Sequence, residues 1–140
     1  MPQGSYVDSL ETIRLLLASK TNITARVGDR IFHGILPPSI TDLWHTRQDV
    51  LPTIYLDLDE DEISADPVSE VGFTITIFAK NHSIGQAIAE IIHEELDQEV
   101  AIEINNQVII CIYQDGVARN SEIDQFDWPI VEISWKAMIA

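Results

Sequence analysis

Residues 130–139 read IVEISWKAMI, and hydrophobic and polar side chains alternate along the whole stretch. Successive side chains of a β-strand point to opposite faces of its sheet, so this period of two predicts a strand with one buried face. The buried face would carry Val131, Ile133, Trp135, Ala137 and Ile139. We therefore expect Trp135 to lie in the core.

Four further stretches have the character of strands. Residues 53–59 place Ile54, Leu56 and Leu58 on one side, and residues 73–79 read FTITIFA, a composition typical of strands. Residues 100–104 and 107–113 flank Asn105-Asn106, a pair that tolerates the positive φ angles of a tight hairpin.

Two stretches show helical spacing instead. The first runs from Asp8 or Ser9 to Lys20, and the second runs from Ser83 to Leu96, with a predicted capping box formed by Ser83 and Gln86. Hairpins dominate the connections, and the helices do not alternate with every strand. We expect one α+β domain over residues 1–140, with a mostly antiparallel β-sheet and two amphipathic helices packed on one face.

The chain is strongly acidic. Its 140 residues include 8 Lys and Arg against 23 Asp and Glu, a formal net charge of −15. This balance disfavours a clamp for nucleic acid or an anionic membrane, because both require surplus positive charge. No apolar run approaches the roughly 20 residues that span a bilayer. The start of the chain does not resemble a signal peptide, and its single cysteine, Cys111, is expected to be a buried thiol. Both observations favour an intracellular, reduced protein.

No catalytic motif is complete. The acidic run from Asp57 to Glu62 resembles the start of a calcium loop, but Glu62 and Val68 stand where glycine and glutamate are needed. The segment from His93 to Asp97 lacks the second histidine of a zinc-protease helix, and the other histidines are assigned to loops. We expect no enzyme, no cofactor and no metal site. A small metal-assisted enzyme using Asp57, Asp59 and Asp61 remains an alternative.

A long connection, Gly34 to Pro52, is a candidate for contact with another molecule. At about 19 residues it exceeds normal loop lengths. Trp44 lies in it beside His45 and Arg47, and an aromatic side chain flanked by polar groups is typical of protein interfaces. We take Trp44, His45 and Arg47 as candidates for a subunit or tube interface.

The order of these elements resembles the tail terminator, or tail completion, proteins of long-tailed bacteriophages. The resemblance covers nearly the whole chain and rests on an N-terminal amphipathic helix followed by four segments, Gly28-Asp29-Arg30-Ile31-Phe32, Leu51-Pro52-Thr53-Ile54-Tyr55-Leu56, Phe73 to Ala79, and Ser83 to Leu96. It implies an antiparallel sheet flanked by helices. It also implies a structural virion protein that assembles in the host cytoplasm.

In this family a ring, usually of six subunits, caps the tail tube, ends its polymerisation and joins the tail to the head connector. The implied partners are further copies of the chain, the tube protein and the connector. We hypothesise that Asp57, Asp59, Glu60, Asp61 and Glu62 line the lumen or its rim, where negative charge repels DNA phosphates and lets the genome pass unbound. A symmetric ring needs two complementary patches per subunit, and an exposed strand edge would be the second.

Two other functions remain open. Another neck or head–tail connector protein would use the same ring and acidic channel. A DNA-mimic inhibitor is the alternative from a different class, since a net charge of −15 could imitate a phosphate array in a basic groove.

Overall fold

The computed structural model describes residues 6–34, 36–37, 51–58, 63–65, 68–97, 99–121 and 129–140. Its helices are α1 (Tyr6–Ala18), α2 (Thr21–Val27) and α4 (His82–Leu96). Its strands are β1 (Ile31–His33), β2 (Thr53–Leu58), β3 (Ile63–Ala65), β4 (Val68–Phe78), β5 (Glu99–Ile104), β6 (Gln107–Gln114), β7 (Arg119–Ser121) and β8 (Ile130–Ile139).

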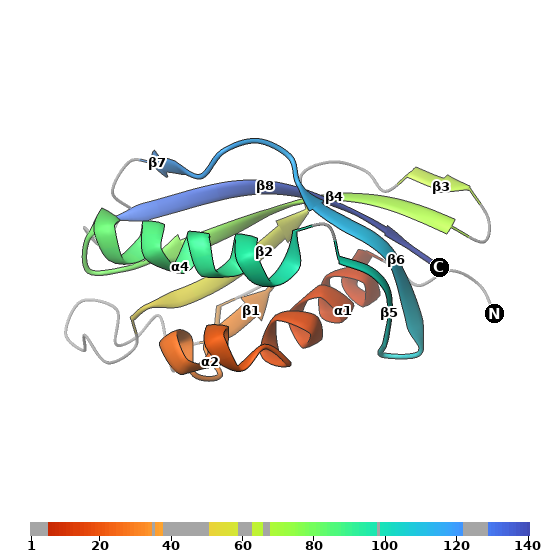
Figure 1. The fold of residues 1–140 in the computed structure, drawn as a ribbon, viewed down its shortest axis with the longest axis horizontal. Coiled ribbons are helices and arrows are strands. Elements are labelled where there is room, and N and C mark those ends of the chain that lie inside the picture. Colours follow the sequence, from red (N-terminus) through yellow and green to blue (C-terminus); the bar gives the residue numbers. More distant parts are fainter. Residues whose placement is uncertain are drawn as a thin grey trace.

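The strands form one sheet in the order β1-β2-β4-β8-β6-β5, with β3 on β4 and β7 on β8 (Figure 1). The β1–β2 pair is parallel, and the other described pairs are antiparallel. The predicted α+β fold with a mostly antiparallel sheet is therefore confirmed. The alternating stretch 130–139 becomes β8, which pairs with β4, β6 and β7 and lies in the middle of the sheet.

The core lies on one face of this sheet. Phe73 of β4 stands opposite Trp135 of β8, and both side chains are completely buried, as predicted for Trp135. Side chains of α1, α2 and α4 join the strands in one hydrophobic cluster. On the opposite face, half-buried polar side chains such as Thr76 and Ser134 alternate with the core residues, and the described helices leave that face uncovered (Figure 1).

The helix α2 is absent from the sequence-based prediction. Its seven residues are too short to display a helical period, although Ile23 and Val27 are buried. Gly28 ends it with a positive φ of 62°, and its backbone N–H donates to the Thr24 carbonyl at 2.7 Å. A backbone of this kind suits glycine, which lacks the Cβ that would clash.

The predicted capping box of α4 is wrong. Asn81, in extended conformation, is the N-cap, and its side-chain oxygen accepts a hydrogen bond from the Ile84 backbone N–H at 2.9 Å. The helix consequently begins at His82, so Ser83 already lies inside its first turn. In the first turn, Ile84 is 37% exposed, whereas Gly85 is buried.

The hairpin prediction holds, but the prediction for Cys111 does not. Asn105 and Asn106 have φ angles of 55° and 59° and join β5 to β6. Cys111 is only half-buried, because the register between β6 and β8 shifts beside it and directs it to the uncovered face. There it stands between Val100 and Met138, which are 63% and 37% exposed.

We predict that Gly85→Ala destabilises the protein. Alanine normally stabilises a helix relative to glycine by about 1 kcal/mol. Here an added Cβ would lie 2.6 Å from Cγ2 of the buried Val131 side chain. Overpacking of this kind costs about 1–3 kcal/mol, measurable as a fall in the free energy of unfolding in urea.

The control is the same substitution in a Val131→Ala background, where the clashing methyl group is absent. The destabilisation by Gly85→Ala should shrink or change sign there. Equal losses in the two backgrounds would contradict the close approach of α4 to β8.

Candidate functional site

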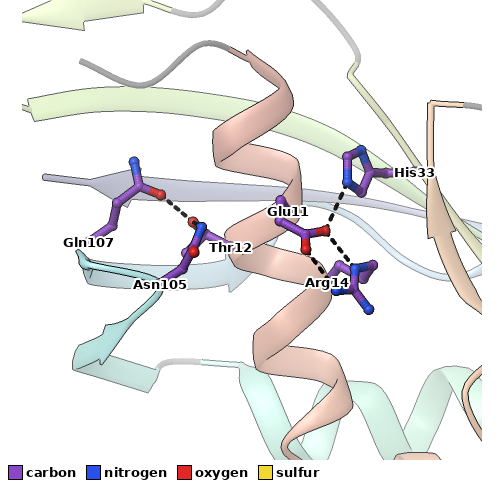
Figure 2. A network of polar contacts seen from close by, with 6 residues as sticks. All are labelled: Glu11, Thr12, Arg14, His33, Asn105 and Gln107. Atoms are coloured by element: carbon purple, nitrogen blue, oxygen red, sulfur yellow. Dashed lines mark hydrogen bonds and ion pairs between the residues drawn. The ribbon is translucent and has the colours of Figure 1, made fainter. Parts of the chain in front are cut away.

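A polar cluster attaches α1 to the end of β1 (Figure 2). Arg14 donates to the two carboxylate oxygens of Glu11 from Nε and Nη2, at 2.6 and 2.7 Å, and His33 Nε2 lies 3.0 Å from Glu11 Oε1. His33 ends β1 and His82 begins α4, so the prediction that these two histidines lie in loops is wrong. The Glu11–Arg14 spacing of three residues is visible in the sequence as a helical ion pair, but nothing in the sequence pairs either residue with His33.

On another side of α1, Thr12 contacts the β5–β6 hairpin (Figure 2). Its hydroxyl accepts a hydrogen bond from Asn105 Nδ2 at 3.1 Å and donates to the Gln107 side-chain oxygen. Because β1 and β5 stand at the two ends of the strand order, α1 contacts both ends of the sheet. One helix thus fixes the two sheet edges relative to each other.

The ends of the predicted interface loop are held against β2. Arg30 Nε donates to the Pro52 carbonyl at 3.0 Å, and the Tyr55 hydroxyl donates to the Gly34 carbonyl at 2.5 Å. Burial and then the nearby Asp57 carboxylate raise the pKa of Tyr55, which keeps the phenol protonated as a donor. Both ends of the Gly34–Pro52 connection are therefore fixed by the fold.

The structure places few of the predicted site residues. Asp57 is exposed near the end of β2, on the side of the sheet away from the core, opposite Thr74 of β4. Asp59, Glu60, Asp61 and Glu62 lie outside the described residues, as do Trp44, His45 and Arg47. Their roles as lumen and interface residues stay predictions.

A hydrogen-bonded cluster joins the end of α4 to β6. Asp97 Oδ1 accepts from the Gln114 backbone N–H at 2.7 Å, and His93 Nδ1 lies 2.8 Å from Gln114 Oε1. The Gln114 side-chain amide also donates to the Gly116 carbonyl at 2.7 Å. Asp97 follows the last residue of α4, and only the tertiary fold brings it to β6.

Within the described residues, no group of three or more His, Cys, Asp or Glu side chains is arranged to hold a metal ion. None of the described helices combines the length and hydrophobicity needed to cross a bilayer.

Comparison with known proteins extends the fold assignment. No protein-family model and no curated protein sequence matches the chain. Among solved structures, it is similar to a chain in the virion of a native gene transfer agent particle, with a TM-score of 0.63. The match covers 96% of this chain and 98% of that chain, at 12% sequence identity. The two chains share a fold over almost their entire lengths.

We predict that the Glu11 cluster makes stability depend on pH in the acid range. The hydrogen bond from Arg14 is the largest cause that lowers the pKa of Glu11 from its ordinary 4.5 to about 2, with a smaller contribution from His33 and opposed by burial. Because the folded-state pKa lies below the unfolded one, ionised Glu11 stabilises the fold above pH 4.5. That contribution is lost as the pH falls toward 2.

Urea unfolding of the wild type and Glu11→Gln at several pH values between about 6 and 2.5 would measure this dependence. The difference in unfolding free energy between the two proteins should shrink as the pH falls. Glu103→Gln, which removes an exposed carboxylate, controls for the change in net charge. A gap between wild type and Glu11→Gln that stays constant with pH would refute the assignment.

Proposed function

We propose that this chain is a structural virion protein of the tail-terminator type. It would form a ring, of six subunits in our proposal, that caps the tail tube, ends its polymerisation and joins it to the head connector. The observation that supports the proposal most directly is the fold shared over 96% of the chain with a chain of a phage-like virion particle. The order of sequence elements that resembles tail terminators supports it independently.

The proposed ring closes through two different patches on each subunit, as a head-to-tail contact requires. The first is the Gly34–Pro52 connection with Trp44, whose ends are fixed by Tyr55 and Arg30. The second is the outer edge of β5, the last strand in the described order, which carries the 63% exposed Val100. A strand edge offers unpaired backbone groups to a neighbouring chain.

In the same proposal, the acidic residues after β2 face the channel through which DNA passes. Asp57 is exposed and lies on the side of the sheet away from the core, a position that supports this proposal because its carboxylate is accessible. Asp59, Glu60, Asp61 and Glu62 follow directly in the sequence. Carboxylates along the channel would repel the DNA backbone and prevent adhesion.

The ring is tested by native mass spectrometry across a range of protein concentration. We expect a closed species at six times the 15.7 kDa chain mass. Trp44→Glu should abolish this species while the far-UV circular dichroism stays unchanged, and Trp44→Phe should retain it. Intact rings with Trp44→Glu would rule out the proposed contact.

Adding tube protein distinguishes a terminator from a connector. The same experiment also detects rings that assemble only on a tube. A terminator should decorate tube ends and arrest their growth, which negative-stain images would show as capped tubes. Tubes that grow unchanged with the wild-type chain present would leave the terminator role without support.

The channel assignment is tested by neutralising five carboxylates together, with Asp57→Asn, Asp59→Asn, Glu60→Gln, Asp61→Asn and Glu62→Gln. We expect rings or caps to form as before but to retain double-stranded DNA in a filter-binding assay at low salt, since electrostatic repulsion is greatest there. A control that neutralises Asp29 and Glu103 should leave DNA retention unchanged. Failure of the five-fold variant to bind more DNA than this control would place these residues away from the channel.

A further inference from the structure

A surface groove runs along α4, between this helix and the connection from β6 to β7. It consists of two adjoining hollows of about 420 and 330 Å³ that share Gln86 and Glu90. The first hollow continues to His93, Glu94 and Gln114, and the second extends toward His82. The opposite wall is formed by Val117, Ala118 and Asn120.

The first hollow of the groove is largely apolar, whereas the second is lined mainly by polar side chains. Val117 on its wall is 75% exposed, the largest exposure among the large hydrophobic side chains in the described residues. Ala89 and Ala118, on opposite walls, add small aliphatic surface. An exposed apolar surface set into a hollow is typical of a site that another molecule covers.

The charge of the groove is negative and uncompensated. Three carboxylates elsewhere in the fold are paired, Glu11 with Arg14, Glu99 with Lys20 at 3.4 Å, and Asp115 with Lys136 at 3.7 Å, whereas others such as Asp29 and Glu103 are exposed. Glu90 and Glu94 are exposed on the α4 wall, and neither forms an ion pair with another described residue.

The groove is also held in shape before anything binds. Gln86 Nε2 donates to Asn120 Oδ1 at 2.9 Å and ties α4 to β7 across it. At the other end, the hydrogen bonds of Gln114 with Asp97, His93 and Gly116 fix the turn that carries Val117. A rigid site loses less conformational entropy when a ligand binds.

We propose that this groove binds a segment of a different protein that carries lysine or arginine next to aliphatic side chains. Long cationic side chains can lay their methylene stems on the apolar wall while their charged ends reach carboxylates such as Glu90 and Glu94. This chain itself is a poor source of such a segment. Four of its eight lysine and arginine side chains, Arg14, Lys20, Arg30 and Lys136, already form internal bonds, and its net charge of −15 opposes approach of a second copy. The inference does not depend on ring formation.

The test is an NMR titration of the ¹⁵N-labelled full chain with an end-blocked probe peptide, Leu-Lys-Ala-Leu-Lys-Lys. Amide shifts should change mainly in residues 82–94 and 114–120. Glu90→Gln combined with Glu94→Gln should weaken the affinity about tenfold, because two ion pairs are lost. Val117→Ser should weaken it as well, because part of the contact is apolar.

The matched control is Asp29→Asn combined with Glu103→Gln, which removes the same charge from exposed positions outside the groove lining. This variant should bind the peptide within a factor of about two of wild type. Equal weakening by both double variants, or shift changes spread over the whole surface, would overturn the proposal in favour of nonspecific attraction. Concentration-dependent shifts of the same groove residues without peptide would overturn it too, since a second copy would then be the occupant.

Discussion

The fold depends on β8, the strand that lies between β4 and β6, and on the burial of its alternate side chains in the core. Ten residue pairs align β4 with β8, and a slip of one residue would turn Trp135 and its buried neighbours toward the uncovered face. The helices need this apolar face as well, and α4 comes close enough that residue 85 has no room for a Cβ. The register of β8 therefore determines which face of the sheet is apolar and where the helices pack on it.

Polar contacts of α1 fix the two ends of the sheet, whose relative positions core packing alone does not determine. Glu11 holds His33 at one end of the strand order, and Thr12 holds the β5–β6 hairpin at the other. The segment after His33 and the edge of β5 are the two patches of the proposed ring contact. A helix packed on the sheet thus sets the separation of two surfaces that neighbouring subunits would have to match.

The acidity of the chain is distributed unevenly over the described surface. Several carboxylates are bound internally to Arg14, Lys20 or Lys136, or, for Asp97, to a backbone N–H. The carboxylates with no such bond include Asp57, near the end of β2, and the pair Glu90 and Glu94 along α4. These are the positions at which the two proposals place DNA repulsion and attraction of a basic partner. A single net charge can support both, because each acts over about a Debye length, roughly 8–10 Å.

The sequence by itself determined the elements that have a local period: the alternation of 130–139, the Asn105-Asn106 turn, the two long helices and the α+β class. These follow from interactions within a few residues, so the pattern is visible along the chain. Tertiary structure alone decided the short helix α2, the Asn81 cap and the half-burial of Cys111. It also decided the contact between Glu11 and His33, 22 residues apart, and the groove between α4 and residues 117–120. Such features arise where segments distant in the sequence come into contact on the sheet, and these contacts produce no regular spacing in the sequence from which they could be predicted.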